Sequence, residues 1–420
     1  MRSSIALACL AVTACFSPIP EAQTQLGPVV VAPAPAPAAP RPEVVAPSTP
    51  VTAVIDALAP NPPATVTETS ELPVISHCRG DDYLRDVRRP QPCVDVGCLF
   101  AIGRDRTPQV LEVGGGGFQV LATDGPKTAW QRIRGQTRAV MVADGAAAPR
   151  QVASLLEGAP VVRFDGDDLL VVEAVSSAAS PWSRVTRYPA DQPESARQLV
   201  MEVPGRLRME RPLAVHAATG RVFVLTSIGL FFSPPRRERG LAGELALPRG
   251  ASPTAFSLLP SGGVLLGVGA DVWWAASTTS APAHLATLPG QAVVQAIAPY
   301  GTGFVAVASS QVFVLEGAGP IRRVLARSDA SPYQTTEAAV VVSGRQLLLS
   351  TLCLSWSSYP GYDVAVLDPD AKTARWWWEV YPSQWDVPDF PVSRANVGGN
   401  QWSSVEVHRS SRGFVTSSLP

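Results

Sequence analysis

The chain has 420 residues, of which 46% are hydrophobic, and its formal net charge is −1. This length and apolar content allow a sizeable core. The nearly neutral charge excludes a protein that binds polyanions through bulk positive charge, so we expect no nucleic-acid partner.

The first fourteen residues have the organisation of a secretory signal. Arg2 precedes an apolar run over Ile5–Leu10, and small residues lead to a cleavage point. Val12-Thr13-Ala14-Cys15 resembles the lipobox of bacterial lipoproteins. The resemblance implies that residues 1–14 are removed and that Cys15 is lipidated, which holds the protein at a membrane without spanning it. The alternative is an ordinary signal peptide followed by an unrelated cysteine.

The lipoprotein signal places the protein in the cell envelope, either periplasmic or surface-exposed, and we favour the outer membrane. Residues 15–74 are dominated by Pro, Ala, Val, Thr and Ser, as in Pro33-Ala34-Pro35-Ala36-Pro37. This composition favours extended polyproline geometry and buries no core. We therefore expect a disordered, semi-rigid linker.

Four cysteines follow the linker, namely Cys78, Cys93, Cys98 and Cys353. An even number in an oxidising compartment indicates two disulfides, and a zinc site is the alternative. Gly97 permits a tight turn between Cys93 and Cys98, so we expect that local pair, which leaves Cys78 to pair with Cys353.

Residues 75–420 repeat one unit, in which an apolar strand, a glycine turn and a second, strongly apolar strand follow one another. The units centre on Gly115, Gly166, Gly220, Gly262, Gly303, Gly344 and Gly399, at intervals of 41 to 55 residues. Such intervals are typical of β-propellers, whose four-stranded sheets pack around a centre. We expect an all-β propeller, with seven blades as the favoured number. A closed ring has no free sheet ends, so part of Ser76–Arg104 should complete the last blade.

Two segments combine an Asp-Pro or Asp-Gly turn with a following tryptophan. Val364–Pro369 leads to Trp376, and Leu121–Thr128 leads to Trp130. Both resemble the hairpin between the third and fourth strands of kelch and quinoprotein-like propellers. The resemblance implies that each tryptophan packs between blades.

Polar clusters along the chain have a plain structural interpretation. Asp165-Gly166-Asp167-Asp168 lacks the ligand spacing of a helix-hand calcium loop, so we expect a polar turn between two strands. Arg236-Arg237-Glu238-Arg239 is expected to form a basic loop between blades, either simply solvated or attractive to an anionic partner. We predict no catalytic residues, metal ligands or cofactor.

Aromatic residues gather in one late repeat, and three consecutive tryptophans there cannot all face one side of a strand. Part of this cluster should pack between blades, and the alternative for the rest is a partly exposed recognition surface. The candidate binding residues are Trp356, Tyr359, Tyr362, Trp377 and Trp385. We therefore expect a binding or assembly module that presents a propeller to an envelope protein or glycan, similar in plan to bacterial outer-membrane lipoproteins. The alternative is an extracytoplasmic glycan lyase or hydrolase on the same scaffold.

Overall fold

The structure is a computed structural model whose regular elements are almost entirely β-strands. It describes residues 97–418 except 103–107, 115–116, 125, 146, 156–159, 178–179, 190–191, 208–211, 237, 239, 248–250, 309–310, 318, 326–337, 355–359, 377–390, 398–401 and 411–412. The helical elements in these ranges are two single turns, η2 (Glu194–Ala196) and η3 (Pro289–Gln291). Within the same ranges, no helix has the length and apolar character needed to cross a membrane.

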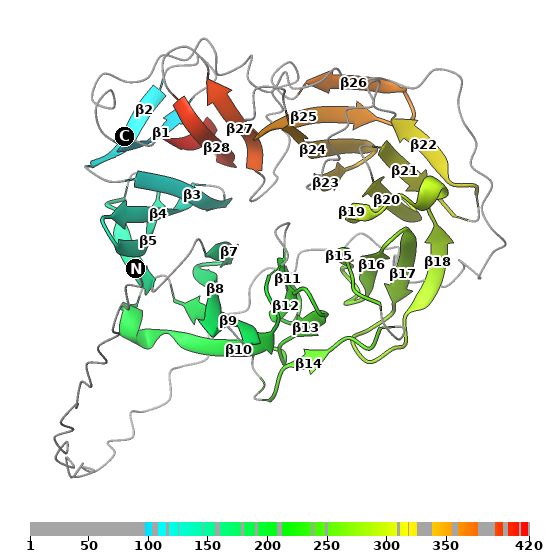
Figure 1. Ribbon diagram of the computed structural model, residues 1–420, viewed down its shortest axis with the longest axis horizontal. Coiled ribbons are helices and arrows are strands. Elements are labelled where there is room, and N and C mark those ends of the chain that lie inside the picture. The colour runs from blue at the N-terminus through cyan, green and yellow to red at the C-terminus, as the bar shows by residue number, and fades with distance from the viewer. Residues whose placement is uncertain are drawn as a thin grey trace, which may run out of the picture. The chain divides into compact units, whose positions relative to one another are not determined.

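The described strands form seven antiparallel sheets (Figure 1). Sheet 1 contains β3 (Gly117–Asp124), β4 (Lys127–Arg134), β5 (Thr137–Asp144) and β6 (Arg150–Leu155). Sheet 2 contains β7 (Val161–Asp165), β8 (Asp168–Ser177), β9 (Ser180–Tyr188) and β10 (Gln198–Pro204). Sheet 3 contains β11 (Leu213–His216), β12 (Arg221–Leu225), β13 (Leu230–Phe232) and β14 (Gly243–Glu244). Each sheet is therefore a meander whose strands pair in chain order.

The same order continues through the second half of the chain. Sheet 4 contains β15 (Ala255–Leu258), β16 (Val264–Val268), β17 (Asp271–Ala275) and β18 (Ala283–Thr287). Sheet 5 contains β19 (Val294–Tyr300), β20 (Gly303–Ala308), β21 (Gln311–Leu315) and β22 (Arg322–Leu325). Sheet 6 contains β23 (Ala338–Ser343), β24 (Gln346–Leu354), β25 (Pro360–Asp368) and β26 (Thr373–Trp376).

Sheet 7 joins the two ends of the described chain. It contains β27 (Pro391–Val397), β28 (Trp402–Ser410), β29 (Gly413–Ser418), β1 (Gly97–Ile102) and β2 (Pro108–Gly114). Strand β1 pairs antiparallel with β29, with Cys98 opposite Ser418 and Ile102 opposite Phe414. The predicted closure of the last blade by part of Ser76–Arg104 is thereby confirmed.

The sheets follow one another in a closed ring. The first strand of each of sheets 1–5 contacts the first strand of the next sheet, along the series β3, β7, β11, β15, β19 and β23. Strand β27 contacts β25 and β24 of sheet 6, and β28 contacts β3 of sheet 1. Figure 1 shows these first strands around the centre, with the fourth strands at the rim. The fold is a β-propeller, as the glycine-spaced repeats predict.

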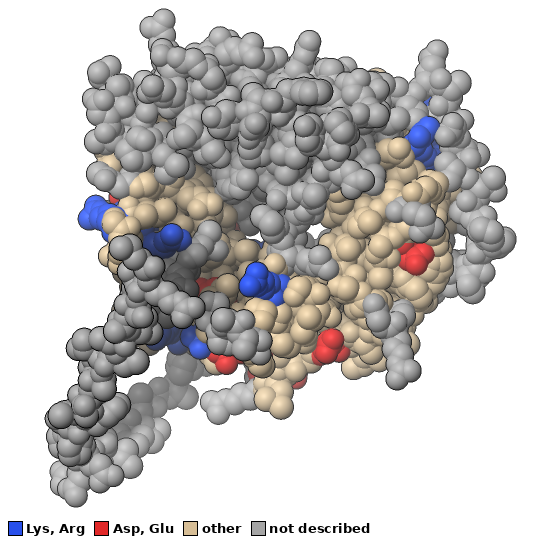
Figure 2. All heavy atoms as spheres, in the orientation of Figure 1, with Lys and Arg blue, Asp and Glu red and all other residues tan. Residues whose placement is uncertain are grey.

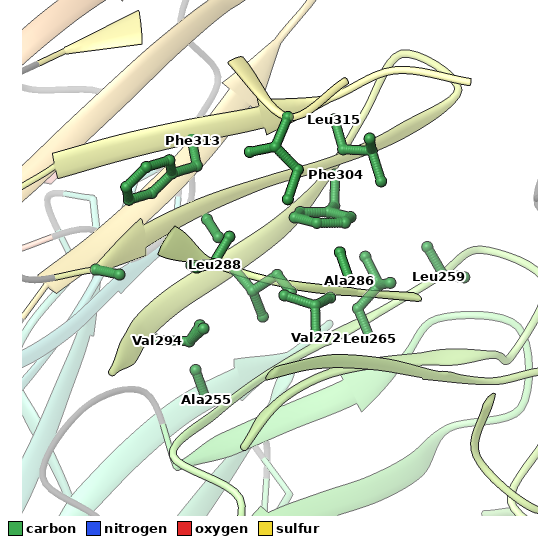
Figure 3. Packing of buried hydrophobic residues seen from close by; sticks show 14 residues of the cluster. Ala255, Leu259, Leu265, Val272, Ala286, Leu288, Val294, Phe304, Phe313 and Leu315 are labelled. Atoms are coloured by element: carbon green, nitrogen blue, oxygen red, sulfur yellow. The ribbon is translucent and has the colours of Figure 1, made fainter. Parts of the chain in front are cut away.

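Apolar clusters fill the seams between neighbouring sheets, which is the packing that holds blades together. Between sheets 4 and 5 the cluster includes Phe304, Phe313 and Leu288, all fully buried (Figure 3). Strand β20 is buried along its whole length, because neighbouring sheets cover both of its faces. Comparable clusters join sheets 1 and 2, 2 and 3, 3 and 4, 5 and 6, and sheet 7 to sheet 1.

One interpretation of the repeats is wrong. Gly114–Gly117 was expected to join two strands of one blade, but it connects β2, at the rim of sheet 7, to β3 of sheet 1. The first hairpin of sheet 1 is β3–β4, with Asp124 opposite Lys127. The Trp130 segment therefore lies between the first and second strands of its sheet. The Trp376 segment does join the third and fourth strands, β25 and β26.

Candidate functional site

The acidic segment Asp165–Asp168 is the polar turn between β7 and β8, as expected. Gly166 adopts a φ of +63°, a conformation that favours glycine. The Lys127 ammonium of sheet 1 donates to the Gly166 carbonyl at 2.9 Å and to Asp167 Oδ1 at 2.6 Å. The turn thus ties sheet 2 to sheet 1.

The two outer carboxylates of the turn face the opposite way along the ring, toward sheet 3. Arg187, on β9, donates from Nη2 to Asp165 Oδ2 at 2.7 Å. Arg236, in the segment between β13 and β14, donates to Asp168 and lies 3.7 Å from Asp165. The basic segment was expected between blades, but it connects two strands of sheet 3, and its Arg236 pairs across to sheet 2.

Beside this ion-pair network lies a pocket of about 420 Å³, which we call the rim groove. One side is formed by β9 and β10 of sheet 2, and the other by the segment between β13 and β14 together with Gly220 of sheet 3. Its lining residues are Arg187, Gln198, Leu199, Val200, Gly220, Ser233, Pro234, Pro235, Arg236, Glu238 and Gly240.

The rim groove runs beside an open strand edge. Strand β10 is the last strand of sheet 2, and in the described part of the chain it pairs with β9 alone. Its Leu199 is 61% exposed, and Leu241, next to the groove residue Gly240, is 95% exposed. Unpaired main-chain groups beside large exposed leucines form a surface that a further polypeptide strand can cover.

Arg187 is the most buried charge of the groove. Its side chain is only 7% exposed, and Nε has no hydrogen-bond partner, the Asp168 carboxylate lying 3.8 Å away. Burial lowers the pKa of the Arg187 guanidinium; Arg236 lowers it further, while Asp165 and Asp168 oppose the shift. The group still remains charged at neutral pH. Two carboxylates therefore surround the buried guanidinium, and one of its donors makes no hydrogen bond.

A comparable network between sheets 5 and 6 provides a contrast. Arg345 follows β23 and donates from Nε to Asp370 at 2.8 Å, and it also pairs with Glu316. Its side chain is 49% exposed. Beneath it, Tyr300 donates its hydroxyl to the Arg345 carbonyl at 3.1 Å. This network joins two blades at the surface, whereas the Arg187 network lines a groove.

A second pocket, of about 290 Å³, lies at the seam between sheet 7 and sheet 1. Leu99, Leu111 and Trp130 contribute to its mostly apolar wall. The Glu112 carboxylate of β2 accepts from Trp130 Nε1 at 2.9 Å and pairs with Arg132. This seam closes the ring.

Most of the sequence-predicted site residues lie outside the described residues. These are Cys15, Cys78, Cys93, Trp356, Tyr359, Trp377 and Trp385, and only the backbone is described for Tyr362 on β25 and Cys353 on β24. Cys98 is fully buried on β1 and is disulfide-bonded. Its partner is not among the described side chains, so the Cys93–Cys98 and Cys78–Cys353 pairings stay predictions.

The groove was not predicted from the sequence as a site, although two of its parts were noticed as polar segments. Asp165–Asp168 and Arg236 are about 70 residues apart, and only the packing of sheet 2 on sheet 3 brings them together. Figure 2 shows acidic and basic side chains interspersed on the described part of one face. The distribution of charge alone therefore does not locate the groove. The groove is recognised only when the acidic turn and Arg236 are seen to meet at one seam.

Fold and site define a closed β-propeller with a polar groove between two blades. No family model matches the chain, and no curated protein matches it. Similar solved structures include YCF48 bound to D1 peptide, at 11% identity and a TM-score of 0.44 over 67% of this chain and 95% of that one.

Nup159 is present in two further similar structures. One is a chain in the S. cerevisiae complex of Dbp5 bound to Nup159, Gle1, IP6 and ADP, at 12% identity and a TM-score of 0.43 over 84% of this chain and 98% of that one. The other is the N-terminal domain of Nup159, at 10% identity and a TM-score of 0.40 over 85% of this chain and 99% of that one. These likenesses are too distant to carry function, and the propeller assignment depends on the strand order.

Proposed function

We propose that this chain is a binding module of the cell envelope, held to a membrane by a lipid on Cys15, that presents a β-propeller to a protein partner. The lipobox-like segment Val12–Cys15 supports the anchor. The rim groove beside the open edge of β10 supports the partner, and it is the observation that carries the proposal.

A polypeptide suits this site better than a glycan. An edge strand offers N–H and C=O groups at the spacing of another main chain, and recognition by strand addition uses those groups for affinity. The exposed Leu199 and Leu241 add apolar surface at the two sides of the groove. Protein interfaces combine apolar residues with polar groups that form hydrogen bonds, and this surface offers both.

Site-specific photo-cross-linking tests this function in intact cells. A benzoyl-phenylalanine at Leu241 should form an adduct with one envelope protein, and Leu199→Glu should remove that adduct. The matched control carries the cross-linker at Ala283, an exposed position on β18, the corresponding outer strand of sheet 4. Equal adducts at both positions, or none at position 241, would contradict the proposal.

A further inference from the structure

We propose that one face of the propeller rests on a membrane surface that carries anionic lipids, with apolar side chains at the lipid boundary and arginines at the phosphates. This inference depends on the lipid anchor of the proposed function and adds how the anchored propeller is oriented. It joins three observations, namely the division of turns between two faces, the exposed apolar side chains of one face, and the arginines beside them.

The strand order divides the turns of the ring between two faces. Lys127, at the turn between the first two strands of sheet 1, donates to Gly166 at the corresponding turn of sheet 2. In the same way Tyr300 of sheet 5 donates to the Arg345 carbonyl of sheet 6. These turns therefore share one face, and the turns between second and third strands lie at the opposite ends of the strands. We call this opposite side the hairpin face; its described turns are 135–136, 226–229 and 269–270, together with the end of the β8–β9 hairpin.

Four of the seven large apolar side chains that are exposed in the described chain lie on the hairpin face. They are Val175, Trp182, Ile228 and Val293, each between 38% and 52% exposed. Val175 of β8 lies opposite Trp182 of β9, near the end of their hairpin. Val293 precedes Val294, whose N–H donates to the Gly269 carbonyl of the sheet 4 turn at 2.7 Å. The exposed apolar side chains thus extend over sheets 2, 3 and 4.

Contacts of Gly205 join the parts of this surface that belong to sheets 2 and 3. Its N–H donates to the Pro181 carbonyl at 2.8 Å, next to Trp182. It also lies against Ile228, because a Cβ built on Gly205 would come within 3.1 Å of Ile228 Cγ1. Trp182 and Ile228 are therefore held at neighbouring positions by the backbone between them.

The hairpin that carries Trp182 has an uncharged end. Glu173 and Arg184 lie opposite each other, and the described strand residues beyond them, 174–177 and 180–183, are all uncharged. Such an end can enter the headgroup region of a bilayer without removing an ion from water. Tryptophan is enriched at that depth, because its ring is apolar while its N–H can still reach polar groups.

Two exposed arginines lie beside the apolar side chains. Arg206 follows β10, and its carbonyl accepts from the Ser227 N–H, next to Ile228. Arg134 is the last residue of β4, at the sheet 1 turn. Among the described residues, neither guanidinium has an ion-pair or hydrogen-bond partner. A lipid phosphate supplies the anionic acceptor that both groups lack.

The acids near the hairpin face already have partners. Glu202 pairs with Arg184 at 2.7 Å, and Asp271 lies 3.2 Å from His284 Nε2. The described charges on this side are Arg134, Arg138, Arg184 and Arg206 against Glu173, Glu202 and Asp271, which leaves a formal charge of +1. The two arginines without partners, rather than this small excess, are what favours an anionic surface.

A membrane fits this face better than a single polypeptide segment. The rim groove includes residues 233–236, between β13 and β14, and the second pocket includes residues 147–149, between β5 and β6, so both pockets belong to the opposite face. The hairpin face instead presents its apolar side chains on separate turns of three sheets, which suits an extended surface. A lipid on Cys15 would keep that surface close, so weak contacts would be sufficient for docking.

The anchor alone does not select the hairpin face. Strand β1 begins with Cys98 opposite Ser418, which lies at the end of β29 away from the hairpin face. In polyproline geometry, residues 15–74 reach on the order of 150 Å, so either face can meet the membrane. A preference for the hairpin face must therefore come from its own side chains.

The test uses the lipidated full chain reconstituted into vesicles of phosphatidylcholine and phosphatidylglycerol in equal amounts. Benzoyl-phenylalanine at Ile228 is photolysed, and mass spectrometry measures the phospholipid adduct. The matched control carries the cross-linker at Ala218, an exposed residue in the turn between β11 and β12, on the opposite face of the same sheet. Each arginine near an anionic surface contributes about fivefold to binding, so we expect roughly tenfold more adduct at position 228 than at position 218.

Variants assign the contact to the arginines and to Trp182. Arg206→Gln should lower the lipid adduct at position 228 about fivefold, and vesicles of phosphatidylcholine alone should lower it at least as much. Trp182→Glu places a charge at the lipid boundary and should also lower it. The matched control is Arg345→Gln, which removes a charge from the opposite face and should leave the adduct unchanged.

The outcomes separate this inference from the proposed function. Equal lipid adducts at positions 228 and 218, or none at 228 while the chain still sediments with the vesicles, overturn the orientation and leave the anchor intact. The same adduct in both kinds of vesicle overturns the role of the arginines. A cross-linked dimer of the chain at position 228 assigns the face to a second copy and overturns the lipid contact. A chain that does not sediment with the vesicles removes the anchor and this inference together, and the adduct at position 241 still decides whether the groove binds a protein.

Discussion

One carboxylate at the seam between sheet 7 and sheet 1 contributes to closing the ring, and its removal should destabilise the propeller. Glu112 is 11% exposed, accepts a hydrogen bond from the buried Trp130 and pairs with Arg132, whose side chain is 21% exposed. Glu112→Ala leaves the indole N–H unsatisfied, at about 1–3 kcal/mol, and an arginine without its partner. Breaking a fully buried pair costs about 3–5 kcal/mol, and partial exposure reduces this figure. We expect a total loss of about 2–4 kcal/mol.

Urea unfolding of the oxidised chain, followed by tryptophan fluorescence, measures this loss as a shift in midpoint at constant slope. Glu112→Gln keeps an oxygen that accepts from Trp130, so its loss should be about half as large. The control is Glu202→Ala, which breaks an exposed pair with Arg184 inside sheet 2 and should cost less than about 1 kcal/mol. If Glu112→Ala and Glu202→Ala shift the midpoint equally, the seam does not depend on Glu112.

Three further predictions test other parts of the molecule. Gly303→Ala should destabilise the chain by about 2 kcal/mol or more, because the new Cβ would lie 2.0 Å from the Leu315 carbonyl oxygen. In the control Gly344→Ala the new Cβ meets no atom within 4 Å, so the cost should be about 1–2 kcal/mol from the positive φ alone. Similar urea midpoints for the two variants would contradict this packing. Burial raises the pKa of Tyr300 to about 12. Since the folded chain holds this proton more tightly than the unfolded chain, its contribution to stability is complete below about pH 10 and disappears as the pH rises through about 12. Absorbance titration at alkaline pH should lose one late-ionising tyrosine in Tyr300→Phe, and an unchanged curve would refute the shift. Finally, Cys15→Ser should move the protein from the membrane fraction to the soluble fraction, and mass spectrometry of the parent chain should find a lipid on Cys15; an unmodified mature N-terminus would refute the anchor.

The alternation of apolar strands and glycine turns was sufficient to predict the architecture, because each blade is a local meander. Val294–Ala298 and Phe304–Ala308 fall within β19 and β20, with a tight turn between them. The same pattern failed at Gly114–Gly117, since a turn between two blades and a turn within one blade have the same local chemistry. Only the pairing of β1 with both β2 and β29 shows that β2 belongs to the last sheet.

The rim groove was beyond the reach of sequence patterns for a different reason. Arg187, Leu199 and Arg236 belong to three separate segments, and none of them forms a motif with its neighbours in the chain. The spare donor of Arg187 follows from burial between two blades, which no local pattern encodes. The residue types of Asp165–Asp168 were sufficient to predict a turn. The turn lies beside the groove only because sheet 3 packs on sheet 2 and brings Arg236 to its carboxylates.

The pairing of β1 with β29 also determines when the last sheet can form during synthesis of the chain. Strand β1 ends at Ile102, and its partner begins at Gly413, so the N-terminal strand has no neighbour on that side until the ribosome has made almost the whole chain. At about 5–20 residues per second, that wait is roughly 15–60 s. During this time six sheets can form as local meanders, while the apolar β1, with the buried Leu99 and Phe100, remains exposed to other chains. A nascent propeller of this kind is most vulnerable to aggregation just before its synthesis ends.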